Sequence, residues 1–124
     1  MSVQDPYVLP EGLPVPTNDR AADHLGGAEL PDLVLPSSLG AVNVRDFEVL
    51  YVYPRAGRPG RPLLPGWDEI PGARGCTPQS CAFRDHSAEL ATLGVRVAGI
   101  SAQTLDDQVE FAQRNNMPFP VISD

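Results

Sequence analysis

Hydrophobic residues occur in short runs from about residue 33 to the end of the chain. Residues 33–35 and 41–44 are two such runs, separated by the turn-forming segment Ser37-Ser38-Leu39-Gly40, so they predict two short strands around a turn. The run VLYVY at residues 49–53 is continuously aliphatic or aromatic and ends at Pro54. An uninterrupted apolar run of this length predicts a strand that is buried on both faces.

A helix is predicted over residues 77–93. Thr77 is a suitable N-cap, and Pro78 falls in the first turn, where proline is tolerated. Gly94 follows the last apolar position and is expected to end the helix. The apolar side of this helix consists of Cys81, Ala82, Phe83, Leu90 and Leu93.

The rest of the chain alternates between strand and helix patterns. Residues 95–100 predict a strand, and Thr104 caps a second helix with Asp106 and Asp107 in its first turn. Residues 119–122 predict a third strand. Strands that alternate with helices are typical of neighbouring parallel strands, so the fold class is α/β.

Two proline-rich stretches predict irregular structure. Residues 1–27 contain few apolar residues at any useful period, and we expect an irregular arm there, followed by one folded domain over 28–124. Proline and glycine interrupt residues 54–75 throughout, which excludes a regular element. A loop of this length in a small domain is usually functional or disordered. Trp67 either anchors this loop by packing or lines a surface for a substrate or partner.

Composition excludes several classes of protein. The chain has 124 residues, 9 basic and 16 acidic, with a net charge of -7, so a general nucleic-acid-binding role is not expected. No run approaches the roughly 20 apolar residues that span a membrane, and residues 1–25 do not look like a secretory signal. Two cysteines without a signal suit a reducing compartment, and we expect a cytoplasmic protein that uses no cofactor.

Chemistry is concentrated around the two cysteines, Cys76 and Cys81. Cys76 immediately precedes the predicted helix, where unpaired backbone N–H groups and the helix dipole favour a thiolate and lower the thiol pKa. Arg74 lies two residues before Cys76, and the preceding loop adds further positive charge with Arg55, Arg58 and Arg61. A thiolate attacks a peroxide oxygen and becomes a sulfenic acid.

The spacing of the two cysteines sets a condition on their pairing. Within an intact helix their Cα atoms would be separated by roughly 8.7 Å, which exceeds the limit of about 7 Å for a disulfide. The pair therefore bonds only if the first turns of the helix unwind. In that sequence of events Cys76 is oxidised, Cys81 attacks its sulfur, and an external dithiol reduces the disulfide.

Four segments together resemble a peroxiredoxin: VLYVYP, GCTPQSCAFRD, GVRVAGIS and PFPVISD. The resemblance covers residues 29–124 and is to the bacterioferritin-comigratory, or Q-type, group, in which both cysteines lie on one helix. It implies a thioredoxin-like fold, with Cys76 as the peroxidatic cysteine and Cys81 as the resolving one. The implied reaction is reduction of hydrogen peroxide or organic hydroperoxides, with recycling by thioredoxin or another dithiol. Residues expected to support it are Thr77, Arg74, Arg84 and Pro54.

The sequence departs from this family in three ways. The family pattern Pro-x-x-x-Thr-x-x-Cys is interrupted, because residues 55–75 separate Pro54 from Cys76. Ala73 stands where the family has the hydroxyl residue that orients the peroxide, which leaves Thr77 or Tyr53 as substitutes. The family's thiolate-supporting arginine and its last strands and helix would lie beyond the end of this chain. We therefore expect a fold without its C-terminal part, whose exposed sheet edge favours a homodimer.

Three other interpretations stay open at this stage. The cysteines are small buried hydrophobic residues without chemistry, or Cys76, Cys81 and His86 bind a metal, although the usual paired ligand spacing is absent. We expect no metal. The main functional alternative is a peroxidase-inactive thioredoxin-like domain that serves as a redox sensor, dithiol oxidoreductase or binding module.

Overall fold

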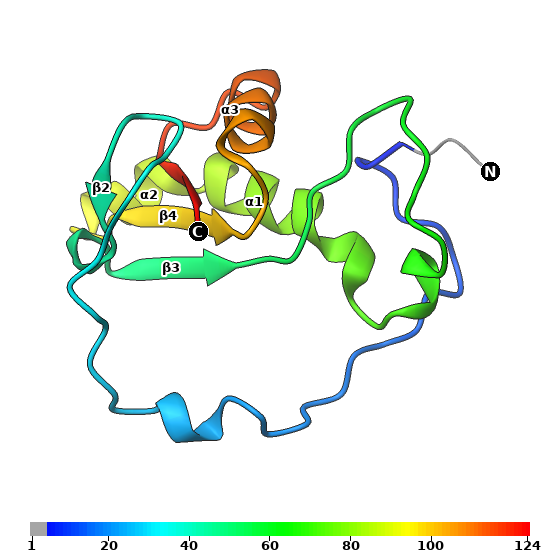
Figure 1. Ribbon diagram of the computed structural model, residues 1–124, viewed down its shortest axis with the longest axis horizontal. Coiled ribbons are helices and arrows are strands. Elements are labelled where there is room, and N and C mark those ends of the chain that lie inside the picture. The colour runs from blue at the N-terminus through cyan, green and yellow to red at the C-terminus, as the bar shows by residue number, and fades with distance from the viewer. Residues whose placement is uncertain (1–4) are drawn as a thin grey trace.

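The computed structural model describes residues 5–124 and is built around a three-stranded parallel sheet (Figure 1). Its strands are β3 (Val49–Val52), β4 (Val97–Ser101) and β5 (Val121–Ser123), in the order β3-β4-β5. Tyr51 is paired with Gly99, and Gly99 in turn with Val121. The parallel α/β arrangement predicted from the alternating pattern is confirmed.

A small antiparallel hairpin precedes this sheet, as the sequence predicts. Strands β1 (Val34–Leu35) and β2 (Val42–Asn43) form it, and a short 3-10 helix, η2 (Val44–Asp46), follows. The turn between the strands reaches the outer edge of β5. There the backbone N–H of Ser38 donates to the carbonyl of Val121 at 3.0 Å, and that of Ser123 donates to Pro36 at 3.0 Å.

The first long helix differs from its prediction in two respects. It starts at Cys76 with Gly75 as its N-cap, so Thr77 lies inside the first turn and caps nothing. It is also two helices, α1 (Cys76–Asp85) and α2 (Ser87–Thr92), separated at His86. The hydroxyl of Ser87 donates to the carbonyl of Arg84 at 2.9 Å, and such a local bond competes with the helical ladder.

Helices α1 and α3 (Leu105–Arg114) pack on the same face of the sheet through aromatic side chains. Tyr51 stacks on Phe83 of α1 with ring centres 4.7 Å apart, and Tyr53 contacts Phe111 of α3. The predicted cap of α3 is confirmed, since Thr104 Oγ1 accepts a hydrogen bond from the backbone N–H of Asp107 at 3.2 Å.

The opposite face of β3 is less covered than the sequence predicts. Side chains of a strand alternate between its faces, so Leu50 and Val52 lie opposite Tyr51 and Tyr53. Val52 is 75% exposed. The continuous apolar run therefore does not make β3 a fully buried strand, because helices cover only the tyrosine side.

The first part of the arm runs beside residues 54–75 at one end of the molecule, and its later part, with the short helix near residue 24, runs away from them along the bottom of the view (Figure 1). Residues 54–75 contain only two 3-10 turns, η3 (Trp67–Glu69) and η4 (Ala73–Gly75), and the described part of the arm contains η1 (Asp23–Leu25). A side chain at Gly72 would contact Pro16 of the arm at about 3.5 Å. Within residues 5–124, no helix is long and apolar enough to cross a membrane.

Candidate active site

Cys76 is the first residue of α1 and lies at the carboxyl end of the sheet. Pro54 ends β3 there, and its carbonyl accepts a hydrogen bond from the Ser101 hydroxyl at 3.1 Å. The chain then passes over the start of α1, while η4 leads directly into Cys76. Only 4% of Cys76 is exposed, and its thiol donates to the Ala73 carbonyl with an Sγ–O distance of 3.7 Å.

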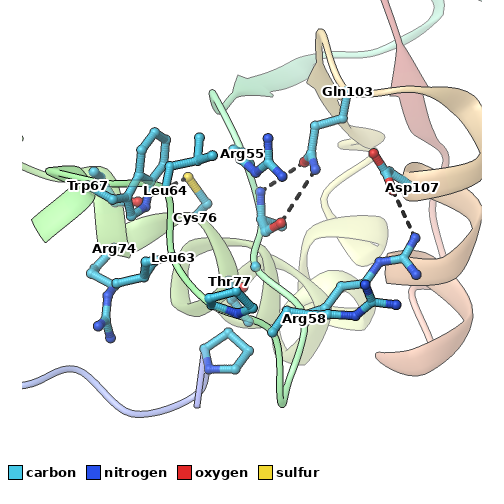
Figure 2. Close-up of a pocket in the computed structure, with 16 residues that line it drawn as sticks. Arg55, Arg58, Leu63, Leu64, Trp67, Arg74, Cys76, Thr77, Gln103 and Asp107 are labelled. Atoms are coloured by element: carbon cyan, nitrogen blue, oxygen red, sulfur yellow. Dashed lines mark hydrogen bonds and ion pairs between the residues drawn. The ribbon is translucent and has the colours of Figure 1, made fainter. Parts of the chain in front are cut away.

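A pocket of about 460 Å³ opens over this thiol (Figure 2). Its walls come mainly from residues 55–75, together with Gln103, Asp107 and one residue of the arm, Pro6. Leu64 and Trp67 also line the pocket, and Figure 2 draws both near the Cys76 sulfur. That Trp67 lines a surface for a substrate or partner stays a prediction.

Four arginines line the pocket, and they fall into two pairs. Arg74 forms an ion pair with Asp68 at 2.6 Å, and Arg58 contacts Asp107 at 2.8 Å. The other two, Arg55 and Arg61, form no ion pair within residues 5–124. Carboxylates therefore neutralise two of the four positive charges predicted around Cys76, and the other two are not neutralised by a carboxylate within residues 5–124.

Burial changes the expected acidity of Cys76. Loss of water around the sulfur raises the pKa of the Cys76 thiol, and the backbone N–H groups of Arg55 and Cys76 oppose that rise only in part. The prediction of a lowered pKa is therefore wrong for this closed arrangement. The reason is that the helix start and the loop that supply the N–H groups also exclude water from the thiol.

Gln103 holds the loop segment that passes over Cys76, and the sequence analysis missed it. Its side-chain oxygen accepts from the backbone N–H of Ala56 at 2.9 Å, and its side-chain nitrogen donates to the carbonyl of the same residue at 3.4 Å (Figure 2). These two hydrogen bonds hold the segment that carries the Arg55 N–H. The position of Gln103, two residues after β4, could have indicated this role, because the carboxyl ends of parallel strands meet at one edge of a sheet.

The two candidate hydroxyl groups have different surroundings. Thr77 lines the pocket together with Cys76. Tyr53 is buried, and its hydroxyl donates to Oε1 of Gln108 at 2.8 Å, so it is already occupied. Burial also raises the pKa of Tyr53. Of the two residues, Thr77 is the one that lines the same pocket as Cys76.

Cys81 lies further along α1 in different surroundings. It is half-buried, outside the pocket, and its thiol donates to Oδ1 of Asn115 with an Sγ–O distance of 3.8 Å. Burial raises the pKa of Cys81, while nearby Arg84 and Arg114 act to lower it. Arg84, predicted as a supporting residue, thus lies near Cys81, where its guanidinium donates to the carbonyl of Asn115 at 3.0 Å. Both cysteines are free thiols.

The arm reaches this second thiol through Tyr7. Its hydroxyl donates to Oδ1 of Asn115 at 2.8 Å and accepts from Nη1 of Arg114 at 2.8 Å. The same Asn115 oxygen therefore accepts hydrogen bonds from both Tyr7 and Cys81. No local pattern predicts this contact, because 108 residues separate Tyr7 from Asn115.

No group of three His, Cys, Asp or Glu side chains within residues 5–124 is arranged to hold a metal ion. The site contains a buried thiol in an arginine-lined pocket and a second thiol on the same helix. These features lie on a thioredoxin-like α/β fold, and they are the kind of site that thiol-based redox chemistry requires.

Comparison with known proteins shows which proteins the chain is similar to. Residues 70–124 match the model of the AhpC/TSA family. Peroxiredoxin bcp1 of Schizosaccharomyces pombe is 30% identical over 94% of this chain and 58% of its own length. Peroxiredoxin Bcp of Escherichia coli is 33% identical over 76% of this chain and 54% of its own.

Solved structures agree with these sequence matches. Peroxidoxin BcpB from Mycobacterium tuberculosis aligns with a TM-score of 0.57 and 28% identity, over 77% of this chain and 56% of its own. Xanthomonas campestris peroxiredoxin Q aligns with a TM-score of 0.59 and 25% identity, over 77% of this chain and 57% of its own. By these matches the chain is similar to the Bcp and Q peroxiredoxins, and it spans little more than half the length of these proteins.

Proposed function

We propose that this chain is a thiol-dependent peroxidase in which Cys76 reduces hydrogen peroxide or an organic hydroperoxide. The observation that supports the proposal most is the placement of Cys76 as the first residue of α1, beneath an arginine-lined pocket. The names of its relatives point to the same chemistry.

The reaction proceeds in two steps. The Cys76 thiolate attacks one oxygen of the peroxide, the O–O bond breaks, and the products are a Cys76 sulfenic acid and an alkoxide or hydroxide that takes up a proton. The Cys81 thiol then attacks the Cys76 sulfur, which forms a disulfide and releases water. Because both residues lie on α1, the second step requires its first turns to unwind.

An external dithiol, thioredoxin or another, completes the cycle by reducing the disulfide and becoming oxidised itself. A reducing compartment such as the cytoplasm suits this requirement. The exposed edge of β3 favours association of two copies, so a homodimer belongs to the same proposal.

A second candidate function is a peroxidase-inactive redox sensor, dithiol oxidoreductase or binding module. Two observations favour it. Burial raises the pKa of the Cys76 thiol, and Ala73 takes the position of the family's hydroxyl residue. Reactivity of Cys76 with peroxide distinguishes the two candidates.

The test is the intact mass of the reduced protein after one equivalent of hydrogen peroxide, with Cys76→Ser and Cys81→Ser as matched variants. The expected result is loss of two hydrogens in the parent, a mass gain of oxygen in Cys81→Ser, and no change in Cys76→Ser. If the parent stays unmodified for as long as a free small thiol survives, the inactive alternative holds.

A further inference from the structure

Two buried hydroxyl groups lie close to each other beneath α1, outside the pocket over Cys76. Ser80 lies on α1 between Cys76 and Cys81 and is fully buried, whereas Tyr51 lies on β3 and is 5% exposed. Neither hydroxyl oxygen has a hydrogen-bond partner of normal geometry within residues 5–124. A buried hydroxyl without a partner has lost its bonds to water and gained none in return, so the pair destabilises the closed arrangement of α1.

The surroundings of Tyr51 explain why its hydroxyl is unpaired. The ring is stacked on Phe83 of α1, and Phe119 lies edge-on to it. The hydroxyl lies over Gly99, where an added carbon would be 2.6 Å from the oxygen, and glycine has no side chain that could bind it. Ser80 is close enough to act to lower the pKa of Tyr51, but burial prevails and raises that pKa to about 12. The phenol therefore stays neutral.

The position of Ser80 connects this pair with the second step of the proposed reaction. A disulfide between Cys76 and Cys81 forms only if the turns that separate them unwind, and Ser80 lies in those turns. Unwinding moves Ser80 away from Tyr51, so water reaches both hydroxyls and supplies the hydrogen bonds that they lack. The free energy gained by this hydration offsets part of the cost of unwinding.

Resting on the proposed function, we propose that Ser80 and Tyr51 set the rate at which Cys81 resolves oxidised Cys76. Both are positioning residues, because their hydroxyls take no part in the bond changes and act through the unwinding of α1. In the resolving step the Cys81 thiol attacks the Cys76 sulfenic acid, the S–O bond breaks, and a disulfide and water form.

A competing step makes this rate measurable. A second molecule of hydrogen peroxide oxidises the same Cys76 sulfenic acid to the sulfinic acid, and water is released. The sulfenic acid is therefore divided between disulfide and sulfinic acid. The more readily α1 unwinds, the larger is the share that becomes disulfide at a given peroxide concentration.

Two substitutions each remove one of the hydroxyls. Ser80→Ala removes it from α1, and Tyr51→Phe removes it from β3 while the sequence of α1 stays the same. Gln79→Ala is the matched control, because Gln79 is the exposed neighbour of Ser80 and alanine favours a helix there as well. The control thus separates helix propensity from loss of a buried hydroxyl.

The unwinding itself is measured in the reduced proteins by amide hydrogen exchange, which needs no peroxide. We expect Ser80→Ala and Tyr51→Phe each to slow exchange in peptides of α1 about fivefold, as the cost of one unpaired hydroxyl allows. Gln79→Ala should slow it less than about twofold. Equal exchange of α1 in all four proteins would overturn the proposal.

The chemical consequence is measured by intact mass after each reduced protein is treated with increasing hydrogen peroxide. The disulfide product has lost two hydrogens, and the sulfinic acid has gained two oxygens. The peroxide concentration that gives equal amounts of the two should be about fivefold lower for Ser80→Ala and for Tyr51→Phe than for the parent. In a Cys81→Ser background, which cannot form the disulfide, neither substitution should change the rate of sulfinic acid formation.

The outcomes separate this inference from the proposed function. If the parent forms both products and the equal-product concentration is the same in Ser80→Ala and Tyr51→Phe, the inference is wrong and the peroxidase proposal stands. The inference is also wrong if either substitution changes sulfinic acid formation in the Cys81→Ser background, since the effect then lies on Cys76 itself. If peroxide oxidises Cys76 in none of the proteins, the peroxidase proposal is wrong and this inference with it.

Discussion

Cys76 and Cys81 lie on the same ten-residue helix, yet their surroundings differ in almost every respect. Cys76 is buried at the helix start, next to a pocket with arginines and backbone N–H donors. Cys81 is half-buried outside that pocket and bonds to Asn115. The difference follows from position along the helix and not from the thiol itself, and it is the basis on which we propose different chemical steps for the two cysteines.

The largest expected effect comes from a substitution that alters the surroundings of both cysteines at once. A side chain at Gly99 would lie 2.6 Å from the Tyr51 ring, which is stacked on Phe83 and cannot shift freely. Gly99→Ala should therefore lower the free energy of unfolding by about 1–3 kcal/mol, measured by urea denaturation, and should increase the alkylation rate of Cys76 and Cys81 alike.

Gly75→Ala is the control for this change, because no atom lies within 4 Å of the added carbon. It should leave the free energy of unfolding the same or raise it by about 0.4–1 kcal/mol. Equal stability of the two variants would mean that the aromatic layer is not tightly packed beneath both thiols.

A smaller and selective effect is expected from Gln103→Ala, which should affect Cys76 alone. Loss of both hydrogen bonds to Ala56 frees the segment that donates the Arg55 N–H and also excludes water from the thiol. Because burial is the larger of these two influences, the pKa of Cys76 should fall. We expect iodoacetamide to modify Cys76 about tenfold faster at neutral pH, with Cys81 unchanged. The rates are read from time-resolved peptide mass spectra.

The exposed Gln113 provides the control through Gln113→Ala, which should change neither rate. A parallel increase of reactivity at both cysteines in Gln103→Ala would instead point to general loosening of the fold. Convergence of the two Cys76 rates once the pH exceeds the pKa in both proteins would agree with an effect through the pKa.

The smallest effect concerns pH. Burial raises the pKa of Cys76 in the folded protein, whereas the unfolded thiol titrates near its ordinary value of about 8.5. The folded state then binds more protons in alkaline solution, so the stability that burial of the neutral thiol contributes is complete below about pH 8.5 and declines as pH rises through the folded pKa. The free energies of unfolding of the parent and of Cys76→Ser, measured by urea denaturation, should therefore approach each other above that pH. A difference that stays constant up to pH 10 would contradict the raised pKa.

The sequence predicts well the features that depend on local periodicity or on neighbouring residues. The three parallel strands, the hairpin and the Thr104 cap belong to this group, since each is written in a few consecutive positions. The break at His86 was missed because no proline or glycine marks it: Ser87, whose hydroxyl donates to the Arg84 carbonyl there, is a residue that an unbroken helix also accepts.

The candidate site was predictable in part for the same reason. The sequence alone shows that Cys76 lies at the start of a predicted helix and follows a loop with several arginines. The Gln103 contact to Ala56 and the Tyr7 contact to Asn115 join distant segments, so only the folded structure reveals them. The predicted direction of the Cys76 pKa shift was wrong because burial of the thiol depends on how residues 54–75 close over it. The irregular sequence of these residues does not indicate how they close.

We propose that Cys76, and not Cys81, is the first thiol oxidised by peroxide. To test this, the reduced parent protein is treated with one equivalent of peroxide in excess dimedone, which traps sulfenic acid. Trypsin cleaves after Arg74 and Arg84, so both cysteines appear in one peptide, residues 75–84, and fragment masses locate the adduct. We expect the adduct on Cys76. An adduct mainly on Cys81, or one divided equally between the two, would contradict it.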